Sequence, residues 1–150
     1  MAQTGSRLSE LKTATADEGK GSETKDQESE NEKAFHATKP VFDKDAFMER
    51  LSHDYEMAIE ILITYKDHVI GTISSLKNHF NQGNIEGLVT DAHSIKGSSG
   101  NCGCMAVSEI ANHIEKAGQS GDLEEINRLL PELEKYHELS SIEIQKHFSI

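Results

Sequence analysis

Apolar residues recur at spacings of three and four from Phe42 onwards, which is the period of an amphipathic helix. Asp43 is a suitable N-cap for a short first helix that carries Phe47 and Leu51. Longer periodic stretches then predict four more helices, over residues 55–80, 85–100, 105–117 and from 123 to about 144. No stretch shows the sustained alternation of a β-strand, so the pattern predicts an all-α protein.

The breaks between the periodic stretches are short and carry turn and cap residues. Asn81-Gln82-Gly83-Asn84 reads as a helix stop followed by a cap, and Asp122 with Glu125 forms an acidic capping box. Pro131 either kinks the last helix or marks a restart. Because short loops make sequential helices antiparallel, we expect an antiparallel up-down four-helix bundle with a short extra N-terminal helix, over residues 41–150.

Residues 1–40 have a different composition. They are rich in Thr, Ser, Gly, Glu and Lys, and large apolar residues are scarce between Leu11 and Phe35. Such a segment buries too little surface to offset its ordering entropy. We expect a disordered tail or linker that ends at Pro40, with a segment that folds on binding as the alternative.

The formal net charge of −11 limits the classes of partner that the protein is expected to bind. Residues 41–150 hold 18 Asp or Glu against 9 Lys or Arg, and this acidic body repels nucleic-acid backbones and anionic membranes. No apolar run approaches the roughly 20 residues of a membrane span, and the N-terminus lacks the apolar core of a signal peptide. We therefore expect a cytoplasmic monomer that binds neither nucleic acid nor membrane. Cys102 and Cys104 are too close for an ordinary disulfide and too few for a zinc site.

Candidate chemistry is concentrated in the predicted helix 85–100. At about 100° per residue, one helical stripe holds His93, Lys96, Gly97 and Gly100. A neighbouring stripe holds Leu88, Ala92, Ile95 and Ser99, and it is the stripe that a bundle core would take. This arrangement turns His93 towards solvent, with a cation one turn along and glycines that clear the surface beside it.

The motif H-x-x-K-G at residues 93–97, together with the order of the predicted helices, resembles the histidine-containing phosphotransfer (HPt) family of two-component phosphorelays. The resemblance covers residues 41–148. It implies that His93 accepts a phosphoryl group from the aspartyl phosphate of a receiver domain and passes it to another receiver aspartate. It also implies a carrier without its own ATP site, cofactor or metal, with Mg²⁺ supplied by the receiver. The partners would be receiver domains of a hybrid sensor kinase, of response regulators, or of both.

The resemblance also implies roles for the residues around the histidine. Lys96 would neutralise phosphoryl charge, unless it is a solvated lysine or pairs with Asp91 or Glu109. Docking of a partner would involve Gly97, Gly100 and Ala92, and Gly103 would form a structural turn. The histidine would keep one unprotonated ring nitrogen towards solvent while the other is held by a hydrogen bond or water.

Three other interpretations compete with phosphotransfer. A metal-binding bundle would use some of the eight histidines, but of the required Glu-x-x-His motifs only Glu134 with His137 fits. The glycines at 97, 100 and 103 imitate a dinucleotide loop but follow no strand. A bundle that only binds a receiver, without phosphorylation, is the third, and retention of both His93 and Lys96 disfavours it. The sequence is compatible with a separate small protein and with the end of a hybrid kinase.

Overall fold

The computed structural model describes residues 35–150, so residues 1–34 of the predicted tail lie outside the described residues. The last residues of that predicted tail are described and are held in place: Thr38 and Lys39 donate hydrogen bonds to Glu109, and Pro40 O accepts one from Ala106 N. Residues 36–150 form one body. Its helices are α1 (Lys44–Arg50), α2 (Tyr55–Asn81), α3 (Ile85–Asn101), α4 (Met105–Ser120) and α5 (Leu123–Phe148), and the described residues contain no strand. The prediction of an all-α fold is confirmed.

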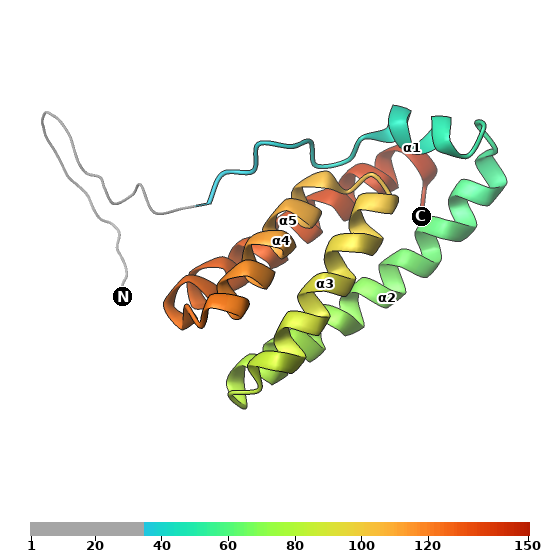
Figure 1. The fold of residues 1–150 in the computed structure, drawn as a ribbon. Helices are drawn as coiled ribbons and strands as arrows, with labels where there is room; N and C mark the ends of the chain where they lie inside the picture. Colours follow the sequence, from blue (N-terminus) through green and yellow to red (C-terminus); the bar gives the residue numbers. More distant parts are fainter. Residues whose placement is uncertain (1–34) are drawn as a thin grey trace, which may run out of the picture. The chain divides into compact units, whose positions relative to one another are not determined.

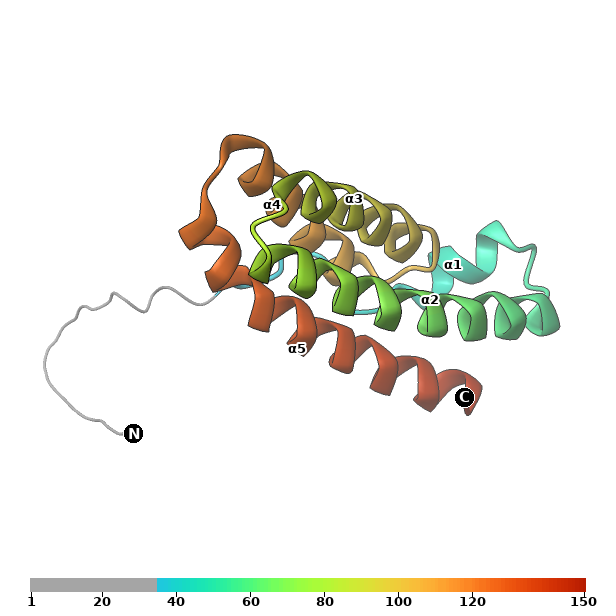
Figure 2. The same cartoon turned by 90° about the horizontal axis from the view of Figure 1, so that it is seen from below.

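Helices α2 to α5 run up and down in sequence order and form the bundle (Figure 1). Two views show α1 at the end of the bundle that also holds the α3–α4 turn and the C-terminus (Figures 1 and 2). A backbone hydrogen bond of 2.8 Å from Asp43 N to Gly103 O fixes α1 to that turn. The predicted helix bounds differ from the observed ones by only a few residues.

The helix starts follow the polar residues that precede them. Asp43 accepts a hydrogen bond from Ala46 N, and Asp122 accepts one from Glu125 N, which confirms both predicted N-caps. Glu125 does not complete a capping box, because its carboxylate pairs with Arg128 at 2.7 Å. Helix α5 passes through Pro131 as a single helix, so the alternative of a restart there is wrong.

The core draws apolar residues from every helix, and it sets the rotation of α3. The predicted core stripe of this helix is buried in full: Leu88, Ala92, Ile95 and Ser99. Tyr65 on α2 and Ser99 share a buried hydrogen bond of 2.9 Å. Because the core stripe fixes the rotation of α3, the neighbouring stripe turns His93 towards solvent.

Close helix packing relies on glycines that the sequence did not single out. A Cβ placed on Gly118 of α4 would lie 2.6 Å from Val89 Cγ2, so this glycine lets α3 and α4 approach closely. Gly71 of α2 serves no such contact, because nothing lies within 4 Å of a Cβ at Gly71.

Candidate functional site

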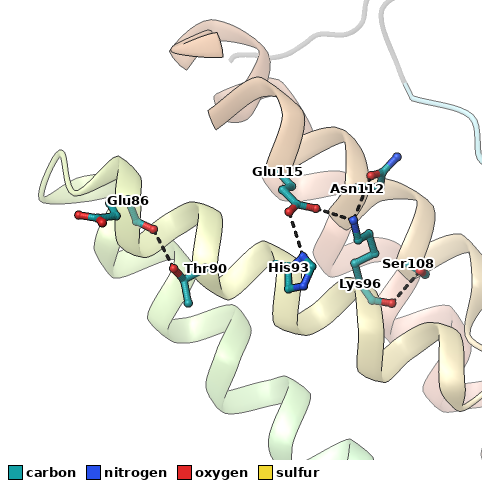
Figure 3. Close-up of polar contacts among 7 residues, drawn as sticks. All are labelled: Glu86, Thr90, His93, Lys96, Ser108, Asn112 and Glu115. Carbon is teal, nitrogen blue, oxygen red and sulfur yellow. Dashed lines mark hydrogen bonds and ion pairs between the residues drawn. The ribbon is translucent and has the colours of Figure 1, made fainter. Parts of the chain in front are cut away.

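His93 lies on the outer face of α3 with 70% of its side chain exposed. Its Nδ1 lies 3.0 Å from Oε2 of Glu115, which projects from α4 (Figure 3). An ionised carboxylate can only accept hydrogen bonds, so Nδ1 must carry the ring proton. In the neutral ring this leaves the lone pair on Nε2, directed away from Glu115, as a nucleophile requires.

Glu115 connects the histidine to a cation. Lys96 Nζ forms an ion pair of 2.7 Å with the other carboxylate oxygen, Oε1, and lies 3.5 Å from Asn112 Oδ1 (Figure 3). Ser108 of α4 donates a hydrogen bond of 2.8 Å to the backbone carbonyl of Lys96. The histidine and the lysine, one turn apart on α3, therefore share one carboxylate from α4.

The predicted partners of Lys96 are wrong. Asp91 instead lies 2.8 Å from His79 Nδ1 on α2 and accepts a hydrogen bond from Ser75. Glu109 accepts hydrogen bonds from Thr38. Both acidic residues are occupied by elements other than α3, so the lysine turns to Glu115.

The charge state of Glu115 follows from its surroundings. Burial alone would raise the pKa of this carboxyl group, since only 11% of its side chain is exposed. The hydrogen bonds and charges of Lys96 and His93 outweigh burial, and the net effect lowers the pKa below its ordinary value. Glu115 is therefore ionised at neutral pH and can stabilise positive charge on the histidine ring.

Few side chains cover the surface beside His93. Gly97 is exposed, and nothing lies within 4 Å of the position that its Cβ would take. On the side towards α2, Ser94 Oγ lies 3.3 Å from Nε2 of the exposed His68. The backbone of α3 is thus open to another molecule one turn after His93, as we predicted for Gly97.

One other predicted docking residue does not fit that role. Ala92 is fully buried in the core, so its side chain cannot contact a docked partner. Gly100 is half-buried, and a Cβ there would make an ordinary contact 3.4 Å from Ser108 Oγ of α4, so its role in docking stays a prediction. Gly103 forms a turn as expected: its φ is 80°, and a Cβ there would lie 2.9 Å from the carbonyl oxygen of Asp43.

Sequence reasoning missed Glu115 as a site residue. The signal was available, because this charged residue interrupts the apolar stripe of α4, one turn after Ala111 and one turn before Gly118, both of which are buried. A carboxylate at a core position needs a partner. Which partner it takes depends on how α3 and α4 are aligned, and that alignment is a tertiary property.

Other candidate chemistry has less support. Among residues 35–150 no group of three or more His, Cys, Asp or Glu side chains is placed to hold a metal ion. Cys102 and Cys104 are free and buried, and burial raises the pKa of their thiols to about 12 and about 11, which disfavours reactivity. None of the helices in this part of the chain has the length and apolarity that a membrane crossing requires.

Comparison with known proteins agrees with the geometry. The fold is similar to that of histidine-containing phosphotransfer protein B (HptB) from Pseudomonas aeruginosa PAO1, with a TM-score of 0.69 and 20% sequence identity. That match covers 73% of this chain and 96% of the other. At 20% sequence identity this similarity shows a shared fold and nothing more.

The sequence itself identifies the family. The family model described as Hpt domain matches residues 60–141, so the chain belongs to the Hpt family, the histidine phosphotransfer domains of phosphorelays. The chain is also similar to "Phosphorelay intermediate protein rdeA" from Dictyostelium discoideum, with 33% identity over 94 residues. This match spans 63% of the chain but 37% of the length of that relative.

Proposed function

We propose that His93 accepts a phosphoryl group from the aspartyl phosphate of one receiver domain and passes it to the aspartate of another. The observation that supports this most directly is the arrangement of His93, Glu115 and Lys96: an exposed imidazole whose Nδ1 is held by a buried carboxylate, with a cation on the same carboxylate. Gly97 leaves the adjacent surface open to a docked domain.

The proposed transfer needs no reactant other than His93 and the aspartyl phosphate of the receiver domain. The lone pair of His93 Nε2 attacks the phosphorus of the acyl phosphate, the bond from phosphorus to the carboxylate oxygen breaks, and the aspartate leaves as a carboxylate. The ring then carries phosphorus on Nε2 and a proton on Nδ1, so it bears a positive charge. Glu115 stabilises that charge through the 3.0 Å hydrogen bond that it already forms. The return step reverses these bonds.

Lys96 supplies the second electrostatic contribution. Its ammonium group has three donors on a flexible stem, and 33% of the side chain is exposed. When a phosphoryl group arrives, the ammonium moves from Glu115 to the phosphoryl oxygens, while the newly charged ring takes over as partner of the carboxylate. The net charge next to Glu115 therefore changes little during transfer.

In this proposal the chain is a carrier and not an enzyme with its own ATP site. The receiver domains, of a hybrid sensor kinase or of response regulators, would provide Mg²⁺ and the remaining stabilisation of the transition state. This chain would contribute an oriented nucleophile, one cation and an open docking surface.

A phosphotransfer assay tests the proposal. Incubation with a phosphorylated receiver domain should label the wild type but not His93→Gln. His113→Gln is the control, because it alters a different exposed histidine, on α4, and this variant should be labelled like the wild type. The label should be lost in acid, as expected for a phosphoramidate. A folded wild type that binds phosphorylated receivers but acquires no label would instead favour the binding-only adaptor.

A further inference from the structure

Residues 38–50 form a segment that we call the N-terminal latch: a non-helical stretch with bends, residues 38–43, followed by α1. The latch precedes the region that the Hpt family model matches, residues 60–141. It contacts the part of the bundle where α3 and α4 are joined. We propose that the latch positions Glu115 against His93 by holding the α3–α4 turn, and this inference rests on the proposed function of His93.

The first contacts of the latch are with the turn itself. Asp43 N donates to Gly103 O at 2.8 Å, and Ala106 N donates to Pro40 O at 2.9 Å. Helix α4 has Cys104 at its N-cap without a side-chain hydrogen bond, so Pro40 satisfies a donor that would otherwise lack a partner at the helix start. The backbone of the latch therefore acts as the missing cap of α4.

A second contact reaches further along α4. The carboxylate of Glu109 accepts hydrogen bonds from Thr38 N at 2.9 Å, from Thr38 Oγ1 at 2.8 Å and from Lys39 N at 3.2 Å. Three bonds to one carboxylate fix the latch along the first turns of α4, the helix that carries Glu115.

A third contact holds the end of α3. Arg50 Nη2 donates to the carbonyl oxygens of Gly100 at 3.3 Å and Asn101 at 2.9 Å. The last turn of α3 contains no basic residue of its own, so Arg50 supplies the cation that a helix C-terminus favours. The latch thus holds both helices at the turn that joins them.

The site depends on the alignment of these two helices. The hydrogen bond from His93 to Glu115 and the ion pair from Lys96 to Glu115 both cross from α3 to α4. Because the 3.0 Å bond crosses between the two helices, a shift of about 2 Å along the helix axis would lengthen it to about 3.6 Å, beyond hydrogen-bond range. A segment that fixes the turn therefore influences the tautomer and orientation of His93 without touching it.

Arg50 and Glu109 are the positioning residues to test, in the full chain. Arg50→Ala removes the contact to α3, and Glu109→Ala removes the contact to α4. Arg50→Lys and Glu109→Gln keep part of each contact and guard against loss of folding. Arg128→Ala is the matched control, because Arg128 pairs with Glu125 near the opposite end of the bundle.

Two measurements separate positioning from simple stabilisation. Nitrogen NMR of the His93 ring reports how strongly the proton prefers Nδ1, and single-turnover transfer from a phosphorylated receiver at saturation reports the chemical step. We expect Arg50→Ala and Glu109→Ala to shift His93 towards a mixture of tautomers and to slow transfer by about tenfold. Arg50→Lys and Glu109→Gln should restore part of both signals, and Arg128→Ala should change neither.

The inference is overturned if the two alanine variants melt at lower temperature but keep the wild-type His93 spectrum and transfer rate. If either alanine variant does not fold, the same comparison applies to Arg50→Lys and Glu109→Gln, and wild-type behaviour in both measurements would likewise overturn it. Failure of the proposed function would look different: the wild type would accept no phosphoryl group, while the NMR spectra would still decide whether the latch positions His93.

Discussion

Replacement of Glu115 by glutamine tests the chemical role of the buried carboxylate. Glutamine has nearly the same shape, so α3 and α4 should keep their packing. The change removes the negative charge that holds His93 Nδ1 and Lys96. The amide oxygen can still accept a hydrogen bond from Nδ1, but as a neutral group.

The expected size of the effect follows from the two kinds of hydrogen bond. A bond to a charged group contributes about 1.5–3 kcal/mol, against about 0.5–1.5 kcal/mol for a neutral one. The difference of about 1–1.5 kcal/mol applies mainly to the transition state, where the ring of His93 becomes positive. Since about 1.4 kcal/mol corresponds to a factor of ten in rate, Glu115→Gln should accept the phosphoryl group roughly five- to tenfold more slowly than the wild type.

Single-turnover transfer from a phosphorylated receiver measures this rate, with circular dichroism to verify that the variant is folded. Glu125→Gln is the matched control, because Glu125 also pairs with a cation but lies near the start of α5. Lys96 remains in Glu115→Gln, so the experiment isolates the carboxylate. A folded Glu115→Gln that transfers within twofold of the wild-type rate would refute the reasoning.

Three further predictions concern docking, the turn and pH. Gly97→Gln should leave the free domain as stable as wild type or slightly more stable, since its Cβ meets no atom within 4 Å, but it should slow transfer strongly. Transfer at the normal rate would contradict a docking role. Gly71→Gln is the control that shows the stability gain from helix propensity alone. Gly103→Ala should lower the free energy of unfolding by about 1–3 kcal/mol in urea titrations, because φ is 80° and Asp43 O is too close; unchanged stability would argue against a strained turn. Because the pKa of Glu115 is lowered, its ionised form stabilises the fold at pH values above the ordinary carboxyl pKa of 4.5, and this contribution disappears as the pH falls through the lowered pKa. Urea titrations should therefore show that the stability difference between wild type and Glu115→Gln shrinks in acid. A difference that stays constant with pH would contradict the pairing.

The local features of this fold were readable from the sequence. Helical periodicity and the caps at Asp43 and Asp122 depend on residues close together in the chain. The same holds for the exposure of His93, because the core stripe of α3 that contains Ile95 leaves the neighbouring stripe with His93 outside the core. The burial of Ala92 followed from that stripe as well, and assigning it to docking contradicted the pattern.

Contacts between helices could not be read in the same way. The pairing of Lys96 with Glu115, and not with Asp91 or Glu109, depends on the alignment of α3 with α4 and on competing partners from α2 and the latch. The packing role of Gly118 likewise needs the position of Val89 on the neighbouring helix. Side-chain spacing along one helix contains no information on these alignments.

The most direct test of the central claim is to locate the phosphoryl group on the phosphorylated chain. Phosphorus and nitrogen NMR on protein labelled in its histidines can show which ring nitrogen is bonded to phosphorus. We expect one phosphoramidate, on Nε2 of His93, with the Nδ1 proton retained next to Glu115 and with the signal lost in acid. Phosphorus on Nδ1, on another histidine such as His79, or in an acid-stable ester would contradict the account.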